Sequence, residues 1–191
     1  IGDFCRQHGV TAQALSVTTW ALTLAGYLET LDVVFGLILS GRNFAGADEI
    51  MFPTMNTVAF RTLLHGSRAD MLRYVQDSLG GIAEHQHYPL RRACLDAGAR
   101  ELFDTLFIYQ KRPERKSSNE QPLYQSVGEF SDTGYPLSVE MELVNGSMIC
   151  RLAARGDAFE CNDAIGIVDR IQQVFRMIVN DPEQATVERS N

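Results

Sequence analysis

Residues 51–61 read Met-Phe-Pro-Thr-Met-Asn-Thr-Val-Ala-Phe-Arg. The stretch is an apolar run that holds an amide and a hydroxyl side chain side by side, Asn56 and Thr57, and ends on Arg61. A second apolar block, residues 33–39, precedes it and is closed by Ser-Gly-Arg at 40–42. Short β-branched blocks bounded by turn residues are typical of buried strands. The sequence therefore predicts two strands, at 33–39 and 55–64, joined by a loop that contains Gly and Asp.

Apolar residues with helical spacing precede and follow these two strands in the sequence. Thr11 is a candidate N-cap for a largely apolar helix that ends near Leu28. Ser67 caps a second helix, and Asp70 completes a capping-box variant. Pro89 breaks the chain before a short helix at 90–97, a third strand is expected at 102–109, and a last helix at 163–180. The polar stretch 111–121 is predicted to be a mobile loop.

A hairpin is predicted at Asn145-Gly146, because this dipeptide suits a two-residue turn in which both residues have positive φ. The register pairs Leu143 with Met148, Met141 with Cys150 and Val139 with Leu152, all on one face. Glu140 and Arg151 oppose each other on the other face. Interleaved helices and strands of this kind favour a two-layer α/β sandwich, with helices packed on a mixed sheet.

Composition narrows the function. The 191 residues carry a net charge of −7 and are 45% hydrophobic, which indicates a globular domain and argues against a nucleic-acid partner. No window approaches the roughly 20 apolar residues of a membrane span. The start shows no signal peptide and reads as a piece of something longer, so we expect a cytoplasmic protein whose four cysteines, Cys5, Cys94, Cys150 and Cys161, are free thiols.

The histidines offer no complete catalytic set. His8 is expected in a surface loop before a helix, and His65 in a turn at a strand end. His85 and His87 form an His-x-His pair, but no Asp, Glu or Cys is well placed beside them, so a structural or channel-wall role is favoured over a metal site. We expect no bound metal.

The Asn-Thr pair has two interpretations. Two polar side chains inside an apolar strand need partners, since each unpaired one costs roughly 1–3 kcal/mol. Asn56 and Thr57 either bond to neighbouring backbone and hold a strand in place, or line a polar channel. Arg61 is either a surface charge or a buttress for a neighbouring element.

The order of these motifs resembles the second half of a condensation domain of nonribosomal peptide synthetases. Residues 10–42 resemble the long helix and strand of that family. Residues 51–61 are similar to the motif GxFVNTxxxR, with Asn56, Thr57 and Arg61 matching. His85-Gln86-His87-Tyr88-Pro89-Leu90 resembles (H/N)QDYPF, with His87 for Asp and Leu90 for Phe. Residues 102–110 and the closing hairpin and helix also resemble the family, and Met-Phe-Pro-Thr-Met-Asn-Thr resembles fungal synthetases of hydroxamate siderophores.

The resemblance implies the C-terminal lobe, spanning residues 1–191, of an enzyme built from two chloramphenicol-acetyltransferase-like lobes around a tunnel. Two peptidyl carrier proteins present phosphopantetheine-tethered substrates, and no cofactor binds the lobe directly. The HHxxxDG histidine belongs to the N-terminal lobe and is absent here, so the resemblance implies no catalytic residue in this chain, which alone is expected to be inactive. Implied substrate-channel residues are Asn56, Thr57, Arg61, Phe107, Tyr109 and Gln110.

The partners so implied are the N-terminal lobe, the carrier proteins and a neighbouring adenylation domain. The whole enzyme is expected to form amide or ester bonds between carrier-bound acyl and aminoacyl groups. Two alternatives remain open at this point. One is a lobe of an epimerisation or terminal cyclisation domain, and the other is a non-catalytic module that docks a carrier protein.

Overall fold

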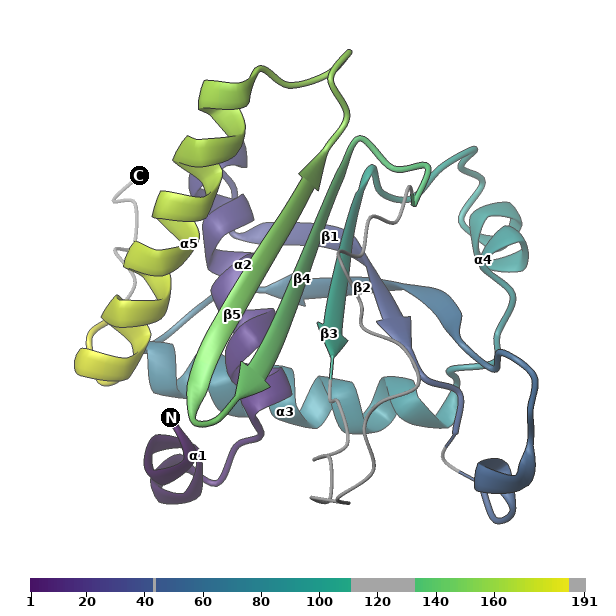
Figure 1. Cartoon of the computed structure of the whole chain (residues 1–191), viewed down its shortest axis with the longest axis horizontal. Coiled ribbons are helices and arrows are strands. Elements are labelled where there is room, and N and C mark those ends of the chain that lie inside the picture. The colour runs from purple at the N-terminus through teal and green to yellow at the C-terminus, as the bar shows by residue number, and fades with distance from the viewer. Residues whose placement is uncertain (43, 111–132, 186–191) are drawn as a thin grey trace, which may run out of the picture.

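The computed structural model describes residues 1–42, 44–110 and 133–185, which fold into two layers (Figure 1). The elements in chain order are α1 Gly2–His8, α2 Ala12–Leu28, β1 Asp32–Leu39, the 3₁₀ turn η1 Ala47–Glu49, β2 Asn56–Leu63, α3 Arg68–Glu84, α4 Leu90–Asp96, β3 Thr105–Gln110, β4 Leu137–Val144, β5 Ser147–Ala154 and α5 Cys161–Asn180. The predicted α/β sandwich is confirmed.

The sheet has five strands in the order β2-β1-β3-β4-β5. β1 pairs antiparallel with β2 and parallel with β3, β3 pairs parallel with β4, and β4 pairs antiparallel with β5. The sheet is therefore mixed, as predicted. The two parallel pairings need long connections, and the 111–132 stretch between β3 and β4 lies outside the described residues.

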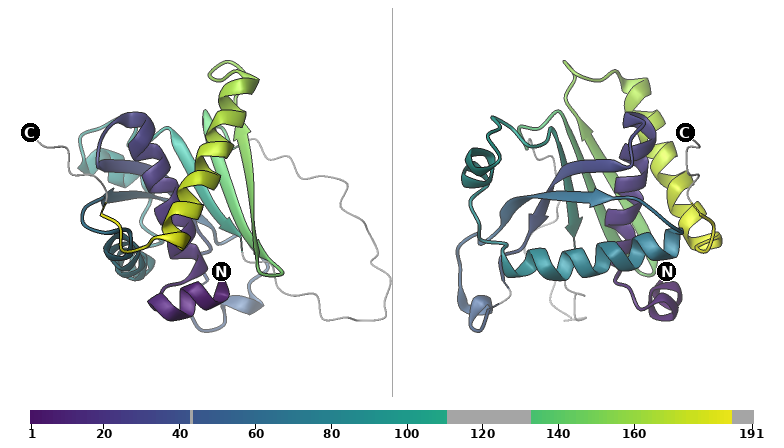
Figure 2. Two further views of the ribbon diagram at one scale, coloured as in Figure 1. Left: turned by 90° about the vertical axis from the view of Figure 1, so that its left-hand side faces the viewer. Right: turned by 180° about the vertical axis from the view of Figure 1, so that it is seen from behind.

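The helices α2, α3 and α5 lie together on one face of the sheet, behind the strands in Figure 1 and seen from two other sides in Figure 2. Strand residues alternate between the two faces, and the ones that meet the helices form the core. Phe35, Phe60 and Phe107 lie at its centre, with Phe35 in ring contact with both of the others. We call the opposite side of the sheet its open face, because no described helix covers it.

Helix α2 runs through the middle of the helical layer and is buried on most sides. Thr11 caps it by accepting a hydrogen bond from the Ala14 N–H at 3.1 Å, as predicted. The buried hydroxyls of α2 find their hydrogen-bond partners within the helix. Each one donates to the carbonyl four residues earlier, as Thr18 does to Ala14 at 2.8 Å. The Ser67–Asp70 capping box at the start of α3 is also confirmed.

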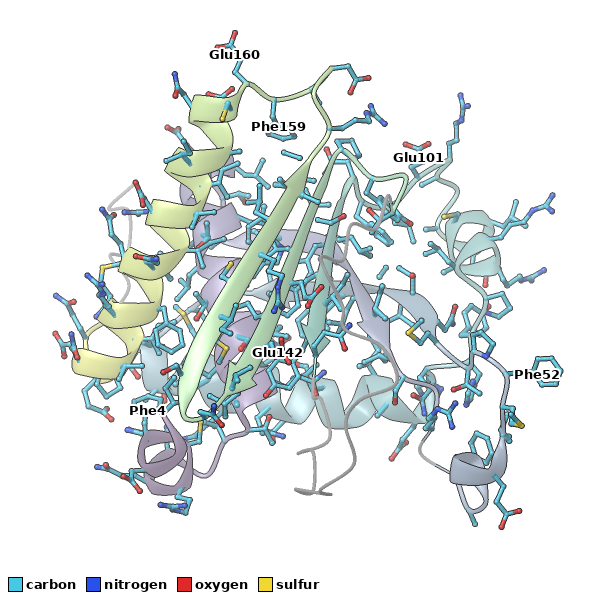
Figure 3. The ribbon with its side chains drawn as sticks, viewed as in Figure 1. Phe4, Phe52, Glu101, Glu142, Phe159 and Glu160 are labelled. Carbon is cyan, nitrogen blue, oxygen red and sulfur yellow. The ribbon has the colours of Figure 1, made fainter. Side chains whose placement is uncertain are left out.

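The hairpin has the predicted turn and register. Asn145 and Gly146 have φ of 49° and 79°, and Met141 pairs with Cys150. Arg151 donates to Glu140 at 2.8 Å, as expected from the register, and also to Glu142 at 3.0 Å, which was not foreseen. Glu142 lies on the open face of β4 (Figure 3) and is nevertheless almost fully buried.

Three expectations need correction or fall outside the structure. The prediction of a surface loop at His8 is wrong, because His8 is the last residue of helix α1 and its ring lies 4.5 Å from that of Phe4. The third strand begins at Thr105 and not at residue 102. Phe103 is instead stacked on Tyr135 and lies over Gly36, where a Cβ would be 2.3 Å from the Phe103 ring. The loop predicted at 111–121 lies outside the described residues.

Candidate functional site

Asn56 links two motifs that are far apart in the sequence. It begins β2 and points to the helical side of the sheet, where the α3–α4 connection passes. Its Nδ2 donates to the carbonyl oxygens of Gln86 at 2.8 Å and Tyr88 at 3.0 Å. Of the two interpretations of this amide, the structure supports bonding to backbone. Both amide protons are used, so a residue without an amide donor cannot replace Asn56 here.

Gln86 brings a third segment into the same junction. Its side chain is buried, and Oε1 accepts the main-chain N–H of Gly41 at 3.0 Å. Gly41 has φ of 67°, and a Cβ there would lie 2.0 Å from the Thr54 carbonyl oxygen. Only glycine fits this position, because any side chain would combine a clash with a left-handed backbone. Residues 41, 56 and 86 therefore form one hydrogen-bonded junction.

The loop between β1 and β2 is stabilised by side-chain hydrogen bonds to its own main-chain carbonyls. The Arg42 guanidinium donates to Ala47 O at 2.6 Å, Ile50 O at 3.2 Å and Phe52 O at 3.4 Å. At the other end of the loop, the Thr54 hydroxyl donates to Ser40 O at 2.7 Å. A planar cation with several donors is well suited to gather diverging carbonyls in this way.

Large apolar side chains of this loop face solvent. Met51 is 97% exposed and Phe52 78% exposed, and Met55 and Phe44 are exposed as well. Figure 3 shows Phe52 pointing away from the rest of the chain. Exposed apolar residues that cluster on one loop mark an interaction surface more often than isolated ones do. We call residues Phe44–Met55 the apolar loop.

Tyr88 is fixed at both ends. Asn56 binds its carbonyl, and its hydroxyl donates to the carboxylate of Asp96 in α4. This hydrogen bond raises the pKa of the Tyr88 hydroxyl above its ordinary value. Asp96 also accepts from Arg92 at 3.0 Å. The His85–Leu90 motif is thus clamped between β2 and α4.

Thr57 and Gln110 lie on the open face of the sheet, by the alternation of strand residues. They belong to β2 and β3, with β1 between them, so their strands are about 10 Å apart. Both side chains are partly exposed. Their predicted role in lining a substrate channel stays a prediction.

Phe107 and Tyr109 point to the other side, towards the helices. Phe107 is fully buried in the core beside Phe35. Tyr109 packs at the core margin, and burial raises the pKa of its hydroxyl above the usual value, with a further contribution from Cys5. Their channel role also stays a prediction. Within this chain Phe107 acts in packing.

Arg61 acts as a buttress. Nε and Nη2 donate to the two carboxylate oxygens of Asp32 at 2.9 and 2.7 Å, which ties the end of β2 to the start of β1. The hydrogen bond from Arg61 is the main reason that the pKa of Asp32 lies below its usual value. Arg61 and Asn56 lie at opposite ends of β2 and on opposite faces, so the structure does not bring these two predicted site residues together.

Candidate acid–base groups do not converge in the described residues. His87 has a ring contact with Phe44 at 6.2 Å, and His65 one with Tyr74 at 5.9 Å. Across residues 1–42, 44–110 and 133–185, no three His, Cys, Asp or Glu side chains come close enough together to hold a metal ion. The same residues include no helix long and apolar enough to cross a membrane.

Two residues of the junction were missed by sequence reasoning. The sequence assigns no role to Gln86 within its motif and marks Gly41 only as part of the turn that closes a strand. A signal existed for Gly41, because a glycine in the turn that closes a buried strand often marks a left-handed backbone. Gln86 gave none, since a glutamine between two histidines before a proline has the composition of an ordinary surface turn.

Comparison with known proteins identifies the family. The family model "Condensation domain" matches residues 1–190. The nonribosomal peptide synthetase sidC of Arthroderma benhamiae is 45% identical over 186 residues, which are 96% of this chain and 4% of that protein. The hydroxamate-type ferrichrome siderophore peptide synthetase of Schizosaccharomyces pombe is 29% identical and covers 87% of this chain. The chain thus spans about 4% of the length of these relatives.

Solved structures agree in fold. The condensation domain of the monacolin K polyketide synthase MokA matches with a TM-score of 0.77 and 15% identity, over 96% of this chain and 44% of that one. A four-domain nonribosomal peptide synthetase, holo-AB3403, bound to AMP and glycine, matches with a TM-score of 0.81 and 16% identity, over 95% of this chain and 16% of that one. The chain belongs to the condensation-domain family, and the resemblance to nonribosomal peptide synthetases drawn from its motifs is confirmed.

Proposed function

We propose that this chain is the C-terminal lobe of a condensation domain that joins substrates carried on two peptidyl carrier proteins. The observation that carries the proposal is the family match over residues 1–190, combined with coverage of only 44% of a condensation-domain structure. A chain of this family that corresponds to less than half of such a domain needs a second lobe to complete it.

The proposed chemistry is acyl transfer. The acceptor amine attacks the carbonyl carbon of the donor thioester, a C–N bond forms and the C–S bond breaks. The amine loses a proton, and the donor's phosphopantetheine leaves as the thiol. The sequence contains no HHxxxDG motif. The group that positions or deprotonates the amine therefore belongs to the partner lobe.

In this scheme the chain supplies surfaces and geometry. The open face of the sheet, with Thr57 and Gln110, is proposed to form one wall of the passage for the phosphopantetheine arms. The apolar loop is proposed to contact the partner lobe, because Met51 and Phe52 are too exposed to stabilise this chain on its own. An adenylation domain and carrier proteins of the same synthetase are the further proposed partners.

The substrate class follows from the relatives. A synthetase named for ferrichrome-type hydroxamate siderophores is among them, and we propose amino-acid derivatives on the way to a siderophore of that type as substrates. An epimerisation or cyclisation lobe and a carrier-docking module are disfavoured, since the matching family model is that of condensation domains.

The test uses the complete condensation domain with a donor carrier loaded with an acyl group and an acceptor carrier loaded with an amino acid. Mass spectrometry of the intact acceptor carrier is expected to show a gain equal to the donor acyl group. A change of configuration without a gain in mass would indicate epimerisation. Binding of carriers with neither change would indicate a docking module, and both results would contradict the proposal.

A further inference from the structure

The apolar loop has little apolar packing to hold it in place. Among its described side chains only Ala47 is buried, while Met51, Phe52 and Met55 face solvent. Hydrogen bonds therefore have a large part in fixing its position relative to the sheet. The Arg42 and Thr54 hydrogen bonds fix the loop to itself and to Ser40. Besides the ring contact of Phe44 with His87, the hydrogen bond from Gly41 N–H to Gln86 Oε1, at 3.0 Å, joins the β1–β2 connection to the α3–α4 connection.

Gln86 is in turn fixed from the sheet. Asn56 Nδ2 donates to the Gln86 carbonyl at 2.8 Å, so the main chain of this residue is held while its side chain reaches the loop. Gln86 therefore holds the base of the apolar loop through its side-chain carbonyl, and it is joined to the start of β2 through its main-chain carbonyl. Gly41 lies at the base of this loop, in a left-handed conformation that only glycine adopts here without strain.

The Nε2 group of the Gln86 side chain does not add to the stability of the fold. Gln86 is 3% exposed, and its Nε2 is buried with no hydrogen-bond partner among the residues that the structure describes. A buried amide with unmet donors destabilises the fold, whereas an apolar side chain of similar shape would avoid this cost. The benefit of the glutamine lies in what Oε1 holds.

We propose that Gln86 is a positioning residue that pre-organises the apolar loop for contact with the partner lobe. The inference rests on the proposed function, because it gives the loop a task in the two-lobe enzyme. Pre-organisation matters for catalysis across two lobes, since a displacement of about 1 Å far from the chemistry can lower turnover by up to about a hundredfold.

The first test is structural and uses this chain alone. In Gln86→Met the side chain keeps its length but offers no acceptor to Gly41. We expect hydrogen exchange of the Gly41 amide, measured by NMR, to become at least about tenfold faster. The melting temperature should change by less than ~3 °C, because losing the Gly41 contact and removing the unmet Nε2 donors act in opposite directions. An unchanged Gly41 exchange rate would overturn the proposal.

The second test measures condensation by the complete domain. Gln86→Met should lower kcat by about tenfold or more, with little change in KM for the loaded carriers. The control is Val174→Ala, which creates a cavity where α5 packs on the core. It lowers the melting temperature further and should leave kcat within about twofold. If Val174→Ala lowers kcat as much as Gln86→Met does, the effect is one of stability and the positioning role is wrong.

Three further variants, Gln86→Glu, Asn56→Ala and the double variant of Asn56→Ala with Gln86→Met, separate the outcomes. Gln86→Glu keeps an oxygen acceptor for the Gly41 N–H and should retain more of the wild-type kcat than Gln86→Met. This variant also keeps the proposal testable if Gln86→Met folds poorly. The kcat losses of Asn56→Ala and Gln86→Met should not multiply in the double variant, since both act on one junction. Independent losses would overturn the inference. Failure of the wild-type domain to condense would instead count against the proposed function.

Discussion

Asn56 and Tyr88 lie 32 positions apart in the chain, and the Asn56 side-chain amide donates to the Tyr88 carbonyl at 3.0 Å. The second amide proton goes to Gln86 at 2.8 Å. The Asn56 side chain therefore supplies hydrogen-bond donors to two carbonyls of the α3–α4 connection, which lie outside a helix. The two most recognisable motifs of the sequence meet in this contact.

Replacing Asn56 should destabilise the fold more than replacing its neighbour. Asn56→Ala leaves two carbonyls without their donor, and the expected loss is about 1–3 kcal/mol in the free energy of unfolding. Thr57→Ala, on the open face, is the control and should cost less. Urea unfolding of both variants measures the difference. Equal losses would show that the two carbonyls gain nothing from Asn56.

Gly41 and Gly46 provide a matched pair. Both have positive φ, 67° and 82°, but a Cβ at Gly41 would meet Thr54 O at 2.0 Å, whereas one at Gly46 would meet nothing within 4 Å. Gly46→Ala should cost about 1–2 kcal/mol for the backbone alone. Gly41→Ala should cost at least ~2 kcal/mol more, because the Ser40–Thr54 contact must open as well. Thermal unfolding of the two variants tests this, and similar losses would argue against the close approach.

The ion pair of Arg61 with Asp32 predicts a pH effect with a definite sign. The pKa of Asp32 is lowered by the hydrogen bond from Arg61. The stabilisation is therefore complete above the usual Asp pKa and is lost as the pH falls through the lower pKa of the folded protein. In Arg61→Ala the pKa of Asp32, followed by carboxyl NMR, should rise towards its usual value. The pair is exposed, so global stability should change little.

Cysteine labelling tests the packing of the hairpin. Burial raises the pKa of the Cys150 thiol to about 11, while Cys161 is exposed at the start of α5. Because the thiolate is the reactive form, Cys150 should react with iodoacetamide at pH 8 more than about tenfold slower than Cys161. Peptide mapping of the labelled chain, with Cys161→Ser to assign the fast site, gives the two rates. Equal rates would mean that β5 is not covered by α5.

Local signals predicted most of the fold. The Asn145-Gly146 turn fixes its own register, so the hairpin and its Glu140–Arg151 pair could be read directly from the sequence. Thr11 and Ser67 likewise announce their helices. Helix α1 was missed because seven residues with Ile1 as N-cap carry no capping side chain. The start of β3 was misplaced because Phe103 is apolar like a strand residue but packs on Tyr135 across the chain.

The site was harder to predict than the fold. Asn56 and Arg61 were singled out as polar residues near an apolar run, and both turned out to hold neighbouring segments in place. Their partners could not be foreseen, because Gln86, Tyr88 and Asp32 approach them only through tertiary structure. Asn56 and Thr57 are adjacent in sequence and point to opposite faces. The substrate-channel role stays a prediction, and Thr57 and Gln110 on the open face are the residues that suit it best.

We propose that this chain is one lobe of a two-lobe enzyme and that the proton-handling group belongs to the other lobe. It is tested most directly by mixing purified residues 1–191 with a donor-loaded and an acceptor-loaded carrier, with and without the separately produced N-terminal lobe. We expect no condensation product from this chain alone and measurable product when both lobes are present. Product formed by this chain without the N-terminal lobe would contradict it.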